Sequence, residues 1–447
     1  MEKSFELEIS EFAARALDAA QAAGVSPAEA TVALSESFCV RVRAKKLEDY
    51  KVNDSVRLTL RGRWQGRIGT ASTQAMDEES LSMLIQGVKE SAELIETDEQ
   101  DDILPPDEHY GAVCNYSEAI ETISAEDKIA LAMCIDERLC AADARIRPDA
   151  TVVSTSSEVF CLKNTLGLDL SHRSNLIYAY ASCLAKAGEQ AATGFKLLWG
   201  YAMEDVSPFE VADGCVKDAL EKLGAGRLPS GARRVVIRNN AMADLLSTFS
   251  GVFSADNAQK GMSLLAGKEG TAIASPAVTL TDDPLMPWGM GSCPFDREGA
   301  ATMTKNVIDG GVLRTLLHNR KTAKKAGVAT TGNAAGSGRV APSNLYIQPG
   351  QATLDDLLAR MGDGLLLTEV SGLHAGANPI SGDFSLLARG FEVVGGRVQR
   401  AVEQFTVAGH FFTLLQDIEA VGSDLLFEGS PIGSPSAAVK ALNIAGE

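Results

Sequence analysis

The sequence has few of the features that would place a protein in a membrane or outside the cell. No apolar run approaches the roughly 18 residues that a membrane-spanning helix requires. The first residues, Met1–Glu6, contain no apolar segment of the kind found in signal peptides. The eight cysteines include no CxxC pair and no zinc-knuckle spacing, so we expect free thiols rather than a disulfide framework. We therefore expect a cytoplasmic protein that has no membrane partner.

Positive charge is scarce. The chain has 41 lysines and arginines against 59 aspartates and glutamates, a formal net charge of −18. A surface of this sign repels a phosphate backbone, so we expect no nucleic-acid partner. Two short basic runs, within Arg57–Arg67 and Arg320–Lys325, are interpreted as a solvated strand edge and a solvated helix face.

Motifs for phosphate or metal binding are also missing. No GxGxxG stands after a strand, and no Gly-Lys-Ser/Thr loop is present. None of the five histidines lies three or four residues from another, so a zinc site would have to be assembled from distant segments. His374 and Ser385 suggest a serine hydrolase, but there is no G-x-S-x-G elbow, and we do not expect a catalytic triad.

Helical and strand patterns mix in the first half of the chain. Apolar residues recur at helical spacing in four segments: 9–23, 77–95, 124–144 and 208–223. In the fourth segment Phe209 is expected to face the core. Apolar residues alternate between 32 and 60 and again between 152 and 184, which predicts antiparallel strands. An acidic, proline-broken connector at 97–111 predicts a sub-boundary within this half.

The second half is richer in glycine and in turn signals. Gly224–Gly231 is the clearest linker, so we predict an N-terminal helix and antiparallel-sheet domain at 1–223 and a C-terminal domain at 224–447. The C-terminal domain is expected to be strand-rich and barrel-like, which makes the fold class α+β. Short helices are expected at 241–251, 319–326, 353–361 and 409–420.

One stretch, Arg233–Val252, organises the prediction for the second half. A buried strand at Val235–Ile237 turns at two asparagines into a helix, and Asn240 is expected to cap the first turn. Four residues share one apolar face of that helix: Met242, Leu245, Leu246 and Phe249.

This stretch resembles the TldD/PmbA family. The PmbA members are also called TldE, and the family is described both as modulators of DNA gyrase and as a two-subunit metalloprotease system. In the TldD branch an HExxxH motif follows two apolar residues that match Leu245 and Leu246. Here Ser247 and Thr248 stand at the first His and the Glu, and Val252 stands at the second His. None of them replaces a zinc ligand or a general base, which implies the PmbA (TldE) branch.

Three further stretches carry the resemblance. Pro294–Gly299 matches a P-[FI]-D-x-E-G segment, 330–334 matches a T-G-[NH]-[AG] turn, and 371–385 matches a glycine-rich loop that ends in G-[DN]-[FY]-S. Glycines allow close main-chain approach, which suits either a groove for an extended peptide or a tight structural loop in a barrel. The candidate peptide-binding residues are Gly376, Asn378, Gly382, Asp383, Phe384 and Ser385.

The resemblance implies a chain with no catalytic residue and no cofactor of its own. The TldD branch completes its metal site with a C-terminal cysteine, where this sequence offers Glu428. Zinc is then expected only in a TldD-type partner chain, with unfolded peptide as substrate. A homodimer is a further possible assembly of the chain alone. Two alternatives stay open: an independent peptidase that uses Glu428, His374 or Cys293, and a non-enzymatic modulator of DNA gyrase.

Overall fold

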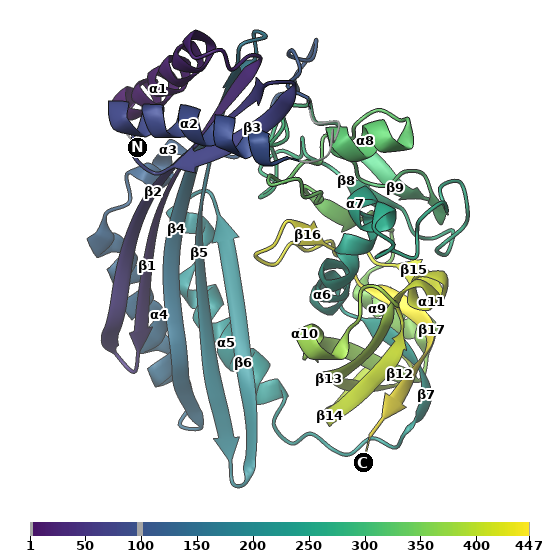
Figure 1. Ribbon diagram of the computed structural model, residues 1–447. Coiled ribbons are helices and arrows are strands. Elements are labelled where there is room, and N and C mark those ends of the chain that lie inside the picture. The colour runs from purple at the N-terminus through teal and green to yellow at the C-terminus, as the bar shows by residue number, and fades with distance from the viewer. Residues whose placement is uncertain (1–2, 96–101, 447) are drawn as a thin grey trace.

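The structure, a computed structural model, describes residues 3–95 and 102–446. The first half of the chain forms a helix-covered antiparallel sheet, and the second half forms a barrel joined to a smaller sheet (Figure 1). The α+β prediction, with a strand-rich and barrel-like second half, is therefore confirmed. The predicted connector at 97–111 lies partly outside the described residues, and the predicted division at 223/224 stays a prediction.

The first sheet has six antiparallel strands in the order β3-β2-β1-β4-β5-β6. These strands are β1 (Ala28–Arg43), β2 (Lys46–Trp64), β3 (Arg67–Thr73), β4 (Ile146–Asn164), β5 (Asp169–Ala187) and β6 (Gln190–Gly200). Side chains of a strand alternate between the two faces of its sheet, so the apolar alternation in the sequence marks one buried face. Val32 and Val40 of β1 both lie on that face and are fully buried.

Four longer helices cover this buried face. They are α1 (Lys3–Ala22), α2 (Glu78–Leu94), α4 (Ala125–Ala142) and α5 (Pro208–Glu221). α1 and α2 pack around Val32, and α4 and α5 pack around Val40 and Ala179. The short α3 (Glu118–Glu121) contributes Ile120 to the same layer. Among the described residues, no helix of this half covers the opposite face of β5 and β6 (Figure 1).

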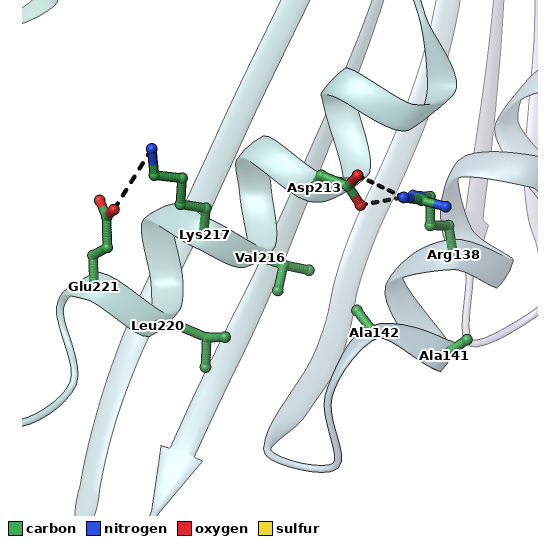
Figure 2. Close-up of a pocket in the computed structure, with 8 residues that line it drawn as sticks. All are labelled: Arg138, Ala141, Ala142, Asp213, Val216, Lys217, Leu220 and Glu221. Carbon is green, nitrogen blue, oxygen red and sulfur yellow. Dashed lines mark hydrogen bonds and ion pairs between the residues drawn. The ribbon is translucent and has the colours of Figure 1, made fainter.

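Two features of α5 concern its exposed side. The prediction that Phe209 faces the core is wrong, because this residue of the first turn is 56% exposed and the Arg138 guanidinium lies over its ring. Further along, α4 and α5 leave a groove of about 580 Å³ between them (Figure 2). Its floor is small and apolar, and its rim carries two ion pairs: Arg138–Asp213 and Lys217–Glu221.

The barrel of the second half closes because β14 pairs with both β13 and β17. Its strands are β7 (Gly231–Ile237), β12 (Gly364–Ser371), β13 (Asp383–Val394), β14 (Arg397–His410) and β17 (Ala437–Ala445), with β15 (Ile418–Val421) beside β17. A smaller sheet has the order β10-β9-β8-β11-β16. It comprises β8 (Leu280–Asp282), β9 (Lys305–Asp309), β10 (Val312–Leu313), β11 (Leu345–Ile347) and β16 (Ile432–Gly433).

Helices in the second half are short. They are α6 (Asn239–Phe249), α7 (Ala255–Gln259), α8 (Arg320–Ala326), α9 (Leu354–Met361), α10 (Leu373–Gly376) and α11 (Phe411–Gln416). The helix expected at 409–420 is shorter than predicted, because β14 extends to His410 and β15 starts at Ile418. Within the described ranges, no helix combines the length and the hydropathy that a bilayer crossing needs.

Candidate functional site

The centre of the candidate site is α6, which follows β7 directly and packs on the barrel. The predicted capping role of Asn240 is wrong, since Arg238 is the residue that precedes the helix and Asn240 lies inside its first turn. The Asn240 amide instead donates to the carbonyl oxygen of Thr368 at 2.9 Å. This bond attaches the start of α6 to β12, a role that the local sequence pattern does not reveal.

The three positions that the resemblance assigns to a metal motif do not converge. Ser247 is exposed, whereas Val252 is 1% exposed and belongs to the main core of the second half. α6 ends at Phe249 and a 3₁₀ turn, Ser250–Phe253, follows, which redirects the chain between the two positions. The Thr248 hydroxyl donates to the carbonyl oxygen of Asp244 at 2.8 Å, within the helix.

These side chains do not fit a zinc ion. Zinc sites in proteins use at least three nitrogen, sulfur or carboxylate ligands. The corresponding positions here offer two hydroxyls, an alkyl group and the Glu428 carboxylate. Across residues 3–95 and 102–446, no three His, Cys, Asp or Glu side chains are grouped in a way that could hold a metal ion.

An acidic group surrounds the exposed side of α6. Burial raises the pKa of Glu428, which lies on the loop between β15 and β16, while Lys196 and Arg238 oppose that rise. The pKa of Asp244 rises to about 6, first because of burial and then because of the negative charges of Glu428 and Glu369. The fold thus brings carboxylates together from α6, from β12 and from the Glu428 loop.

A substitution of Asp244 tests this electrostatic arrangement. The folded-state pKa is about 6 and the ordinary value is 3.8, so the fold binds the proton more readily than the unfolded chain does. The contribution of this group to stability is therefore greatest below about pH 4 and falls as the pH rises through 6. Asp244→Asn should raise the melting temperature at pH 7.5 by about 1–2 °C, a small gain because the side chain is partly exposed, and should change little at pH 4.

Thermal unfolding of both proteins at pH 4 and pH 7.5, followed by circular dichroism, measures this gain. Asp355→Asn, at an exposed position in the first turn of α9, is the matched control and should give no gain at pH 7.5. Equal gains for the two variants would contradict a specific repulsion at Asp244.

The glycine-rich loop predicted to bind peptide is held by its own contacts. The Asn378 main chain bonds Asp383 and Gly382, and Ala377 bridges to Phe384, so the loop occupies the β13 edge at this point. Phe384 is buried, with its ring 6.3 Å from that of Phe249.

The two glycines of this loop allow close packing. A Cβ at Gly376 would lie 2.3 Å from the Ser385 carbonyl oxygen, and one at Gly382 would lie 2.7 Å from the His410 ring. Asp383 and Ser385 are exposed on the outer face of β13. Peptide binding by this loop stays a prediction.

Two residues of the alternative peptidase hypothesis lie in different surroundings. Cys293 lines a cavity of about 330 Å³ between the two halves of the chain, together with His172 and the Glu158–Arg297 ion pair. Burial raises the pKa of the Cys293 thiol to about 11, which disfavours the nucleophilic thiolate. His374 is exposed on α10 and does not line this cavity.

The sequence patterns did not identify the residues that connect β12 and the Glu428 loop to the first half of the chain. The Lys222 ammonium at the end of α5 bonds both Asp218 and Glu369, at 2.9 and 2.8 Å. The Trp199 indole N–H donates to the carbonyl oxygen of Phe427 at 2.7 Å, which holds the Glu428 loop against β6. The only sequence feature that singles out Trp199 is its residue type, because the chain has three tryptophans.

Comparisons with known proteins cover nearly the whole chain. The descriptions "PmbA/TldA metallopeptidase central domain" and "PmbA/TldA metallopeptidase C-terminal domain" match residues 118–225 and 230–446. A Haemophilus influenzae protein named metalloprotease PmbA homolog is 24% identical over 435 residues, which is 95% of this chain and 93% of that protein.

Two solved structures share the fold. One, from Thermotoga maritima and named as a candidate modulator of a DNA gyrase, has a TM-score of 0.92 at 31% identity and covers 98% of this chain and 100% of its own. The other, TldE from Thermococcus kodakarensis, has a TM-score of 0.88 at 21% identity, with coverage of 98% and 100%. On these matches, the chain belongs to the PmbA/TldD family.

Proposed function

We propose that this chain is the subunit of a two-chain peptidase that binds no metal itself, and that its partner is a TldD-type zinc metalloprotease. The assembly degrades or processes unfolded peptides, and its zinc chemistry belongs to the partner. This chain completes the substrate space and holds peptide, without a catalytic residue of its own.

The position of Val252 is the observation that carries the proposal. A zinc-binding helix needs its ligands on one side, yet Ser247 is exposed and Val252 lies in the core. The hydroxyl of Thr248 is engaged by its own helix, and a threonine cannot replace the carboxylate of a general base. Glu428 alone cannot supply the remaining ligands.

Reconstitution with a purified TldD-type chain tests the proposal. Cleavage of an unstructured, quenched-fluorescent peptide should require both chains, and metal analysis should find zinc in the partner and none in this chain. A partner whose HExxxH glutamate is changed to glutamine is the control, and it should abolish cleavage in the mixture. Cleavage by the isolated chain, lost on Glu428→Gln or Cys293→Ser, would instead support an independent peptidase.

A further inference from the structure

Two buried thiols lie in contact between α5 and the first sheet. Cys183 of β5 is 1% exposed, and Cys215 of α5 is fully buried. The Cys215 S–H donates to the Cys183 sulfur at 3.4 Å, and the Cys183 S–H donates to the Cys215 carbonyl oxygen at 3.7 Å. All eight cysteines of the chain are free in the structure, so this pair is in its reduced form.

The close approach of the two sulfurs depends on a glycine of the neighbouring strand. Gly194 of β6 is the register partner of Cys183, and α5 packs directly on it. A Cβ at Gly194 would lie 2.2 Å from the Cys215 carbonyl oxygen and 2.7 Å from the Ala219 Cβ. Because Gly194 has no side chain and Ala219 has a small one, α5 comes close enough to the sheet for the two sulfurs to meet.

Oxidation of this pair needs little movement. A disulfide bond is about 2.05 Å long, so the two sulfurs have to approach by only about 1.4 Å more. Gly214, directly before Cys215, weakens α5 at this point. Val216, directly after Cys215, lines the groove between α4 and α5 (Figure 2). Hydrogen peroxide is little larger than water, so a small local opening of the helix is enough to admit it.

The surroundings favour the thiolate form of Cys183 over that of Cys215. The hydrogen bond from Cys215 is the main reason why the pKa of Cys183 is lowered. The Gly194 N–H and the Lys222 ammonium act in the same direction, against burial and the charge of Asp218. The same hydrogen bond raises the pKa of Cys215, and burial adds to that rise. Since the thiolate is the nucleophile, the Cys183 sulfur is the one that reacts first.

We propose that Cys183 and Cys215 are a peroxide-sensitive pair, and that oxidation joins them in a reversible disulfide that fixes α5 to the sheet. The Cys183 thiolate attacks one oxygen of hydrogen peroxide, the O–O bond breaks, and the hydroxide that leaves takes up the thiol proton to form water. The Cys215 sulfur then attacks the Cys183 sulfenic acid, the S–O bond breaks, and the hydroxyl leaves with the Cys215 proton as a second water. The two thiols lose two electrons and two protons, and the peroxide is reduced to two waters.

The disulfide would restrain the helix that links the two halves of the chain. Lys222, at the end of α5, bonds Asp218 of the same helix and Glu369 of β12. Cys215 lies about two helical turns before Lys222, so a bond to β5 at this point restricts the part of α5 on which the link depends. Oxidation should therefore slow amide hydrogen exchange in α5 about tenfold and leave exchange in α2 within about twofold of the reduced chain.

Peptide mapping of the unchanged full-length chain tests the disulfide. The chain is treated with hydrogen peroxide until the exposed Cys114 and Cys134 are oxidised, and its remaining thiols are then alkylated. Trypsin separates Cys183, in residues 174–186, from Cys215, in residues 197–217. Mass spectrometry should find these two peptides joined with the loss of two hydrogens, and dithiothreitol should release both. Cys161 is the internal control, since it is buried beside the Ser171 hydroxyl and should stay a thiol.

Single substitutions separate the two steps of the reaction. Cys215→Ser keeps a hydroxyl that donates to the Cys183 sulfur but removes the second thiol. It should therefore leave a sulfenic acid on Cys183, which dimedone captures. Cys183→Ser should leave Cys215 a free thiol at the same peroxide concentration, because the thiolate that reacts first is gone.

Three outcomes would overturn the inference, and all of them are read on the unchanged chain, so a variant that fails to fold does not affect the test. The first is complete alkylation of both Cys183 and Cys215 after the exposed thiols have been oxidised. The second is oxidation of Cys183 to a sulfinic acid without a joined peptide. The third is a joined peptide with unchanged hydrogen exchange in α5, which would show that the bond does not fix the helix.

Discussion

A Val252→His variant should lose about 3 kcal/mol of unfolding free energy, even though it places a histidine where the resemblance to the TldD branch implies a zinc ligand. Val252 is 1% exposed and lies in the main core of the second half. Histidine there is larger than the space left by valine, and its two ring nitrogens would be buried without partners. Thermal unfolding followed by circular dichroism should show a melting temperature lower by about 5–10 °C.

Ser247→His is the matched control, because the same side chain at an exposed position should change stability by less than about 0.5 kcal/mol. The triple variant Ser247→His, Thr248→Glu, Val252→His should bind no stoichiometric zinc when measured by mass spectrometry after dialysis. A stable Val252→His protein, together with one zinc per chain in the triple variant, would show that the motif positions do converge. That result would remove the main support for the proposed role.

The elements that sequence patterns predict best are those with many residues and one buried face. β1 and β2 alternate over long stretches, so their apolar residues identify both the strands and the helix-covered face. The residue order at Ser124–Asp127 predicts the start of α4. In the structure the Ser124 side chain accepts from the Asp127 N–H, as expected for a helix cap. Both signals depend on neighbours in the sequence.

The elements that the patterns miss depend on contacts between distant residues. β16 has only two residues, too few to show any alternation, and it pairs with the distant β11. The barrel closes through pairing of β14 with β17, and no local feature of either strand specifies that partner. Asn240 has the residue type of a helix cap, but its amide meets Thr368 of β12, which lies beside β7 in the fold.

The candidate site also has features that the sequence predicts and features that only the fold reveals. Ser247, Thr248 and Val252 carry no side chain that binds zinc well, and this follows from residue type alone, which can be read from the sequence. The grouping of Asp244, Glu369 and Glu428 joins a helix, a barrel strand and a loop, so it follows only from the fold. The ring contact between Tyr201, which follows β6, and Trp288 of the second half likewise joins distant segments, so no local pattern predicts it.

Lys305→Ala should cost about 3–5 kcal/mol, because it leaves a buried carboxylate without its counter-charge. Asp282 is fully buried and accepts from the Lys305 ammonium at 2.8 Å, from the Asn333 amide at 2.7 Å and from the Ser343 N–H at 2.7 Å. The pair joins β8 to β9, and its neighbours Asn333 and Ser343 line the cavity between the two halves. Loss of the charge should therefore loosen the smaller sheet first.

Urea unfolding followed by tryptophan fluorescence, with limited proteolysis to locate the first cleavage, measures this effect. Lys440→Ala is the matched control: it removes an ion pair of 3.2 Å with Asp417, but the lysine side chain is 59% exposed and the expected loss is below about 0.5 kcal/mol. Comparable losses for the two variants would mean that water reaches Asp282. First cleavage within 280–345 for Lys305→Ala would show that the buried pair holds the smaller sheet together, and with it the wall of the cavity.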